Sequence, residues 1–225
     1  MASRDRVAQS LARAVAGAVR RDAPFRHWLP SDILPEGMCA ALTALPIAPP
    51  LIADTLGKRE TNNASRSYAN AENRARFPVC EDLAQALQDG PALRAIEKTC
   101  GVGLGGTNLR IEYCQDSDGF WLEPHTDIGV KKLTFLIYLS GGPGSAGLGT
   151  DLMDPQGNVL GTAPYAPNRG LIFVPGADTW HGFKRRPIPA VRRSLIVNYV
   201  GPEWRARHEL AFPDRPVAPA PARAP

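Results

Sequence analysis

The hydrophobic residues of the first hundred positions recur mainly at helical spacing. Residues 1–22 place Val7, Leu11, Val15 and Ala18 on one side of a helix, which predicts an amphipathic helix packed on the rest of the protein. Three further helices are expected, at residues 35–45, 81–87 and 91–99. The stretch 46–79 is rich in Pro, Asn, Ala and Arg, and we expect it to be mostly irregular.

After Gly106 the pattern changes to short apolar runs separated by glycine-containing turns. Seven strands are expected, at residues 107–115, 120–126, 132–140, 150–153, 158–162, 170–174 and 192–200. A short strand and turn is also expected within residues 24–34. Helices followed by many short strands predict a mainly β fold, a jelly roll with N-terminal helices packed against one sheet.

Two segments of unusual composition, one rich in glycine and one rich in proline and alanine, lie outside the predicted helices and strands. Residues 101–106, Gly-Val-Gly-Leu-Gly-Gly, match the GxGxxG fingerprint of dinucleotide-binding proteins. That motif requires a strand before it and a helix after it, whereas here a helical pattern precedes and a strand follows, so a glycine-rich turn is predicted. Residues 213–225 are rich in Pro and Ala, and we expect a disordered tail. The predicted organisation is therefore an N-terminal helix (1–22), one β domain (23–212) and a tail (213–225).

Composition adds information about the compartment. The chain has 225 residues, 44% of them hydrophobic, which suffices for one domain with a full core. No apolar run approaches the ~20 residues that span a bilayer. Residues 1–22 lack a continuous apolar segment, although their arginines and alanines also resemble a transit peptide. The four cysteines, Cys39, Cys80, Cys100 and Cys114, form no CxxC pair and favour free thiols. We expect a cytoplasmic protein that does not bind a membrane.

The net charge of +4 permits an anionic partner, but charge of this size without a concentrated patch does not predict nucleic-acid binding. Five cations lie a few residues from His125-Thr126-Asp127 or from His181: Lys131, Lys132, Lys184, Arg185 and Arg186. They predict a positive potential that attracts an anionic small molecule; the alternative is an ordinary solvated surface.

The candidate chemistry begins with His125-Thr126-Asp127 and His181. Side chains alternate along a strand, so His125 and Asp127 point to the same side. Two imidazoles and one carboxylate occupy one face of an octahedral Fe(II) and leave three positions open. A chance HxD sequence is the alternative, but an expected strand follows the pair and another precedes His181.

Arg192 and Ser194 lie on one face of the last expected strand. Such a pair suits a small dicarboxylate held by charge-assisted hydrogen bonds. Arg193 is the competing arginine, but alternation directs it to the face opposite Ser194. We therefore prefer Arg192.

With these motifs, residues 24–201 resemble the Fe(II)/2-oxoglutarate-dependent oxygenases, whose motif is HxD…H…RxS on a double-stranded β-helix, and in particular their prolyl-hydroxylase-like branch. The resemblance implies a cupin-like jelly roll. It also implies that His125, Asp127 and His181 are both the metal ligands and the catalytic centre, with Fe(II), 2-oxoglutarate and O₂ as cofactor and co-substrates. Arg192 and Ser194 would bind the distal carboxylate of 2-oxoglutarate.

Two tyrosines acquire roles only through this resemblance. In the prolyl-hydroxylase-like branch, a tyrosine at the position of Tyr138 donates its hydroxyl to the same carboxylate. Tyr113 corresponds to a tyrosine that lines the pocket, although its distance from His125 and the segment between them differ from the family pattern. The alternative for Tyr138 is a core tyrosine.

The resemblance implies a dioxygenase that hydroxylates an unactivated C–H of a small molecule, such as an amino acid, peptide or sugar derivative, and decarboxylates 2-oxoglutarate to succinate. The alternatives are a prolyl-type protein-residue hydroxylase and a non-catalytic cupin-like binding protein. Residues 141–144, Gly-Gly-Pro-Gly, replace the usual turn of prolyl hydroxylases, and Asn198 stands where nucleic-acid demethylases have a second arginine. Substrate contacts are expected from Asn62, Asn63 and Arg66 in the long irregular stretch.

Overall fold

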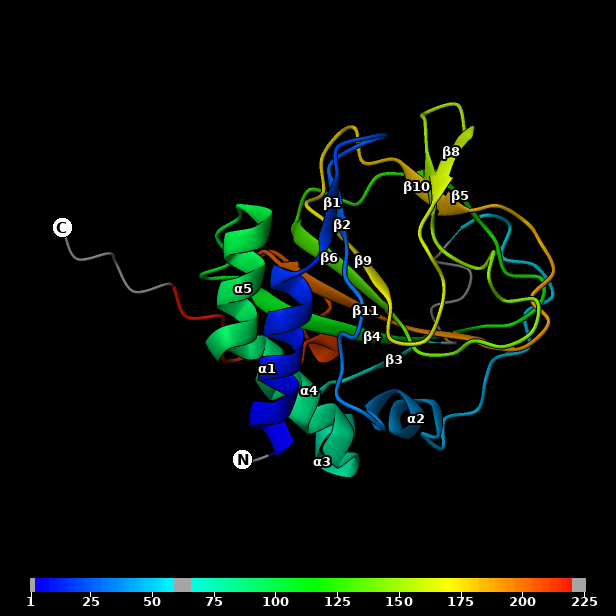
Figure 1. The fold of residues 1–225 in the computed structure, drawn as a ribbon. Coiled ribbons are helices and arrows are strands. Elements are labelled where there is room, and N and C mark those ends of the chain that lie inside the picture. Colours follow the sequence, from blue (N-terminus) through cyan, green and yellow to red (C-terminus); the bar gives the residue numbers. More distant parts are fainter. Residues whose placement is uncertain (1–2, 59–65, 220–225) are drawn as a thin grey trace.

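A computed structural model describes residues 3–58 and 66–219. The helices are α1 (Ser3–Ala16), α2 (Met38–Thr43), α3 (Ala71–Arg76), α4 (Pro78–Gln88) and α5 (Gly90–Cys100), with a short 3₁₀ helix η2 (Arg207–Glu209). The strands are β1 (Val19–Arg21), β2 (His27–Leu29), β3 (Ser67–Tyr68), β4 (Asn108–Asp116), β5 (Leu122–His125), β6 (Lys131–Tyr138), β7 (Asp151–Met153), β8 (Val159–Thr162), β9 (Gly170–Phe173), β10 (His181–Phe183) and β11 (Arg192–Val200). The fold is mainly β, with most of its helices before the long strands (Figure 1).

The strands form two antiparallel sheets. The larger sheet has the order β1-β2-β9-β6-β11-β4-β3, and the smaller one has the order β5-β10-β7-β8. Helices α1, α4 and α5 lie on one side of the larger sheet, and the smaller sheet lies on the other side (Figure 1). The larger sheet is thus the middle layer of the molecule.

Alternation along β4 and β11 gives this middle layer two different faces. Leu109 and Ile111 of β4, together with Leu195 and Val197 of β11, belong to the core that contains the helices. Ile196, one residue away, belongs to a second core between the two sheets. The residues at even positions of β4 and β11 therefore face the smaller sheet.

Helix α1 packs as expected with Val7, Leu11 and Val15 buried, but it is shorter than predicted. It ends at Ala16, before Gly17, a residue that disfavours helix interiors. Val19–Arg21 then forms strand β1, which pairs with β2. A three-residue exposed strand has no period-two pattern of buried positions, so the sequence does not distinguish it from the end of the helix.

The prediction of a disordered tail is wrong for residues 213–219. The side chain of Val217 is buried in the core beneath the helices. Its N–H donates to the Thr107 carbonyl, and its own carbonyl accepts the Gly106 N–H, each at 2.8 Å. Composition missed this segment because Val217 is buried alone among polar residues and prolines, and because the other contacts include hydrogen bonds to its backbone, such as that from Gln88 Nε2 to the Arg215 carbonyl. Residues 220–225 lie outside the described residues.

Other expected elements differ in detail. Helix α3 lies within the stretch expected to be irregular, and the Asn70 side chain accepts the Asn73 N–H at its start. The region around His181 forms strand β10, which lies outside the seven ranges expected to be strands. Gly101 ends α5 at a φ of 68°, and β4 follows, so the GxGxxG segment is a turn from helix to strand. Within the part of the chain that the structure describes, no helix is long and apolar enough to cross a membrane.

Candidate functional site

Strands β5 and β10 bring His125 and His181 together. The two histidines are directly paired in the antiparallel register, and their ring centroids lie 4.3 Å apart. The Nδ1 atom of each ring lies 2.9 Å from the backbone carbonyl oxygen two residues earlier, that of Glu123 for His125 and of Thr179 for His181. A carbonyl accepts only, so Nδ1 carries the proton and Nε2 is left with its lone pair. Both rings are therefore held in the tautomer that binds a metal through Nε2.

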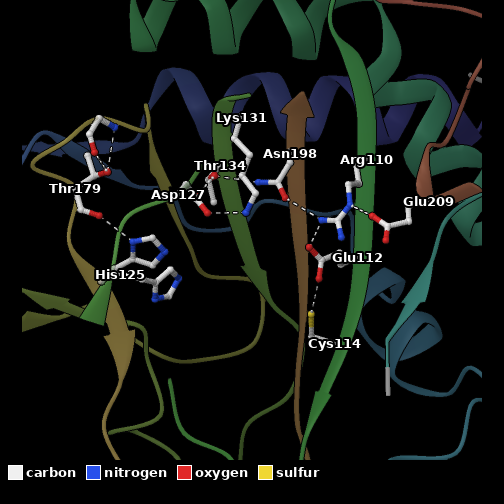
Figure 2. A network of polar contacts seen from close by, with 12 residues as sticks. Arg110, Glu112, Cys114, His125, Asp127, Lys131, Thr134, Thr179, Asn198 and Glu209 are labelled. Carbon is white, nitrogen blue, oxygen red and sulfur yellow. Dashed lines mark hydrogen bonds and ion pairs between the residues drawn. The ribbon is translucent and has the colours of Figure 1, made fainter. Parts of the chain in front are cut away.

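Asp127 follows the end of β5 and is fixed by two hydrogen bonds. Lys131 Nζ donates to Oδ1 at 2.5 Å, and Thr134 Oγ1 donates to Oδ2 at 2.6 Å. Asn198 Nδ2 donates to the same threonine hydroxyl at 2.9 Å, which ties the carboxylate to β11 (Figure 2). Burial favours the neutral acid, but Lys131 and His181 outweigh it and hold the pKa of Asp127 well below its usual range.

The three side chains converge on one point. Potential ligand atoms of His125, Asp127 and His181 all lie within 4.8 Å of one another. Burial, with His125 beside it, lowers the pKa of His181 to about 4, so this ring is neutral and ligand-competent at pH 7. Two imidazoles and one carboxylate are the donors of the facial triad that binds non-haem Fe(II).

Arg192 lies in the same cavity as the three ligands and is almost fully buried. Its Nε donates to the Leu148 carbonyl at 2.7 Å, and its Nη1 donates to Asp116 Oδ2 at 2.5 Å. Burial disfavours the charged form, but Asp116 outweighs this and raises the pKa of Arg192. Ser194 also lines the cavity, and its Oγ is buried without a hydrogen-bond partner.

Arg193 lies on the opposite face of β11, where its Nε donates to Gln115 Oε1 at 3.1 Å. The register of β11 against β4 produces this separation, since Arg192 pairs with Asp116 and Arg193 with Gln115. The structure therefore brings Arg192, and not Arg193, to the cavity of the three candidate ligands.

Neither of the two tyrosines lines the cavity of the three candidate ligands. Tyr113 belongs to the core beneath the helices, because odd positions of β4 face away from the smaller sheet, so its predicted place in the pocket is wrong. Tyr138 is fully buried, and its hydroxyl donates to Thr150 Oγ1 at 3.0 Å and accepts the Thr150 N–H at 3.1 Å. Thr150 lines the cavity, and Tyr138 stands behind it.

A larger cavity of about 340 Å³ is lined by two of the three candidate ligands, His125 and Asp127. Its wall includes Arg66 and three further charged residues that were not predicted, Arg110, Glu112 and Glu209. Glu112 accepts hydrogen bonds from Arg66 Nη1 and Arg110 Nη1, and Arg110 Nε donates to Glu209 Oε2 at 2.5 Å. The sequence did contain a signal, since polar residues recur at every second position of β4 (Figure 2).

The same network reaches the candidate metal ligands. Arg110 Nη1 donates to Asn198 Oδ1 at 3.3 Å, and Asn198 donates to Thr134, which bonds to Asp127. Figure 2 shows this chain of contacts crossing from β4 over β11 to β6. Of the residues expected to contact substrate, Arg66 lines both cavities, while Asn62 and Asn63 lie outside the described residues.

The five basic residues expected to attract an anion have mostly local partners. Lys131 is bonded to Asp127, Arg185 Nη2 donates to Asp54 at 2.5 Å, and Arg186 pairs with Asp151. Lys132 Nζ donates to the Gly129 carbonyl at 3.2 Å. Only Lys131 of the five lines either cavity, so these cations do not form a positive rim in the described part of the molecule.

No family model matches the sequence, and no curated protein matches it. Solved structures do match. A prolyl-4-hydroxylase from Pseudomonas putida has a TM-score of 0.55 and 15% identity, over 85% of this chain and 94% of that one. A prolyl hydroxylase from Trichoplax adhaerens, in complex with a hypoxia inducible factor peptide fragment, has a TM-score of 0.54 and 13% identity, over 88% and 90%.

A further match is HygX from Streptomyces hygroscopicus, a structure with nickel and 2-oxoglutarate bound. Its TM-score is 0.52 at 13% identity, over 80% of this chain and 84% of that one. These identities are low, but the matches cover most of both chains. The chain therefore has the fold of the prolyl-hydroxylase-like 2-oxoglutarate/Fe(II) oxygenases.

Proposed function

We propose that the protein is an Fe(II)- and 2-oxoglutarate-dependent dioxygenase that hydroxylates an unactivated C–H of a small molecule. The observation that carries this proposal is the convergence of His125, Asp127 and His181 in one cavity with Arg192 and Ser194. The two histidines and the aspartate are suited to bind iron, and the arginine and the serine are suited to bind a carboxylate of a dicarboxylate.

The residues fit both groups. Each histidine has its Nδ1 committed to a backbone carbonyl, so Nε2 is the ligand atom, and Asp127 is held in its anionic form. The orphaned Ser194 hydroxyl lines a cavity that also contains the Arg192 guanidinium. A buried hydroxyl without a partner is costly, and a carboxylate that accepts from it removes that cost.

In this proposal, His125, Asp127 and His181 bind Fe(II), while Arg192 and Ser194 bind the distal carboxylate of 2-oxoglutarate. Bound together with O₂, these groups supply an oxidation that places one oxygen atom on the substrate and converts 2-oxoglutarate to succinate and CO₂. The chain contributes orientation and exclusion of water. Lys131 and Thr134 keep Asp127 in place, and Thr134 is itself held by Asn198.

The cavity beside His125 and Asp127 is the proposed substrate site. Its volume of about 340 Å³ suits a small molecule. Arg66 supports a polar substrate, because its Nε is buried without a hydrogen-bond partner and its Nη1 is taken by Glu112. An amino acid, peptide or sugar derivative supplies the acceptor oxygens that such a site requires.

A prolyl-type protein hydroxylase is the second candidate, because two of the three similar structures described above are prolyl hydroxylases. A non-catalytic binding protein of the same fold is less well supported, since the three ligands and the arginine are all present. We also propose that the two sheets form the double-stranded β-helix of this fold. The four free cysteines support a reducing, cytoplasmic location.

The test is a screen of metabolites and proline-containing peptides for compounds that raise the conversion of 2-oxoglutarate to succinate by the iron-loaded protein. We expect a small molecule to raise the turnover of 2-oxoglutarate. The His181→Ala variant should form no succinate with any compound. If a proline-containing peptide is hydroxylated and no small molecule of the screen is, the result would support a prolyl-type protein hydroxylase. Binding of neither iron nor 2-oxoglutarate would contradict both.

A further inference from the structure

Arg192 already has an anionic partner inside the cavity. Asp116 lies opposite it in the β4–β11 register, and Nη1 donates to Asp116 Oδ2 at 2.5 Å. The two side chains are only 6% and 7% exposed, so water screens this pair weakly. Both residues line the cavity of the candidate metal ligands.

The rest of the guanidinium is also confined. Its Nε donates to the Leu148 carbonyl, and its central carbon lies 5.0 Å from the Phe183 ring centroid and 5.7 Å from those of Tyr138 and Tyr165. Among residues 3–58 and 66–219, Nη2 has no hydrogen-bond partner. A carboxylate that enters the cavity therefore meets a guanidinium that is oriented but already neutralised by Asp116.

We infer that Asp116 is a specificity-determining residue that stabilises the empty site and weakens the binding of the distal carboxylate of 2-oxoglutarate. This inference rests on the proposed function. Without a counter-ion, the buried Arg192 charge would destabilise the fold. With 2-oxoglutarate bound, two carboxylates share one guanidinium and repel each other. Asp116 thus stabilises the protein at the expense of co-substrate affinity.

The protein offers a matched control. Asp151 is also a fully buried carboxylate paired with an arginine, Arg186, but neither residue lines the cavity of Arg192. Replacing Asp151 removes a buried charge of the same kind at another place. Asp116→Asn and Asp151→Asn therefore separate the effect on the cavity from a general loss of stability.

The experiment measures binding to the Mn(II)-loaded full-length protein without O₂, by calorimetry, together with the thermal midpoint. The ligands are 2-oxoglutarate and 2-oxopentanoate, which has the same carbon chain but a methyl group in place of the distal carboxylate. We expect Asp116→Asn to lower the thermal midpoint of the protein without 2-oxoglutarate. It should lower the Kd for 2-oxoglutarate by about tenfold, because one nearby unit charge is removed in a poorly screened site.

For 2-oxopentanoate the Kd should stay unchanged in Asp116→Asn, and Asp151→Asn should change neither Kd. Asp116→Ser, which also lacks the charge, provides a second variant and should shift the Kd for 2-oxoglutarate in the same direction. An unchanged or raised Kd for 2-oxoglutarate in folded Asp116→Asn and Asp116→Ser would overturn the inference. An equal change for both ligands would overturn it too. If no variant and no wild-type sample binds 2-oxoglutarate, the proposed function itself fails.

Discussion

The two faces of the larger sheet differ sharply although they are built from the same strands. The face toward the helices carries Leu109 and Ile111 of β4 and Leu195 and Val197 of β11, and it packs against α1, α4 and α5. The face toward the smaller sheet includes the apolar Ile196, but it also carries charged side chains, such as Glu112 of β4 and Arg192 of β11.

The difference shows how one strand serves stability and chemistry together. Side chains alternate with a period of two, so a buried strand can present apolar residues to one layer and ionic residues to the other. Buried charges contribute little net stability, because desolvation offsets their attraction. We therefore assign stability mainly to the helix-facing side and the candidate chemistry to the other side.

The largest loss of activity is expected when one of the three candidate metal ligands is replaced. Replacing His125, Asp127 or His181 with Ala removes one of three donors, which should abolish iron-dependent succinate formation and weaken iron binding. The fold should persist, because these side chains lie outside the main apolar core. Metal titration and circular dichroism of each variant provide the check. A variant that keeps wild-type iron affinity would remove its residue from the ligand set.

The next effect separates the two arginines on opposite faces of β11. Arg192→Ala removes the charged partner of the co-substrate carboxylate and should raise the 2-oxoglutarate requirement at least ~100-fold. Arg193→Ala is the matched control and should leave it nearly unchanged, since Arg193 bonds to Gln115 on the other face. The requirement is measured as the concentration that half-saturates 2-oxoglutarate binding. If Arg193→Ala raised the requirement and Arg192→Ala did not, Arg193 would be the residue that binds the carboxylate of 2-oxoglutarate.

A smaller effect is expected behind the ligands. Thr134→Val keeps the shape of the side chain but removes the hydroxyl that donates to Asp127 and accepts from Asn198. Loss of such a supporting hydrogen bond should weaken metal affinity by about tenfold. Calorimetric titration with Mn(II) measures it. Unchanged affinity would show that Lys131 alone suffices to position the carboxylate.

The smallest effect on metal binding is expected from substitutions on the helix-facing side of the larger sheet. Leu11→Ala creates a cavity beneath α1 and should lower the free energy of unfolding by about 2–5 kcal/mol. Metal affinity of the folded protein should not change, which denaturant unfolding and metal titration test together. A loss of metal affinity comparable to that of Thr134→Val would show that the two faces are coupled.

Sequence alone predicted the elements with strong periodicity. The pattern of hydrophobic and polar residues predicted the mainly β architecture and the buried face of α1. It also predicted the long strands β4, β6 and β11. Two short strands, β1 and β10, were not among the strands expected from the pattern, because they have three residues each and show no repeat. The docked segment around Val217 was hidden because its contacts are mostly backbone hydrogen bonds.

The candidate site was predicted in the same uneven way. The common side of the HxD pair and the face of Arg192 followed from strand alternation, whereas His181 followed from the expected strand before it and from the family motif. The structure brings these side chains into one cavity. Tyr113 was misplaced because its role came from family resemblance, whereas the register of β4 puts it on the other face. Asp116 and Glu112 were missed because charged residues in a strand resemble a solvent-exposed face until the second sheet covers them.

The central claim is that metal and 2-oxoglutarate share one site on the charged face. Thermodynamic linkage makes the effect of each on the binding of the other equal, and the attraction between the metal cation and the dicarboxylate makes that effect favourable. The most direct measurement is a calorimetric titration of 2-oxoglutarate into the protein with and without Mn(II), in the absence of O₂. The account predicts that Mn(II) lowers the Kd for 2-oxoglutarate on the order of tenfold or more, and that this effect disappears in His181→Ala. Equal 2-oxoglutarate affinity with and without the metal would contradict it.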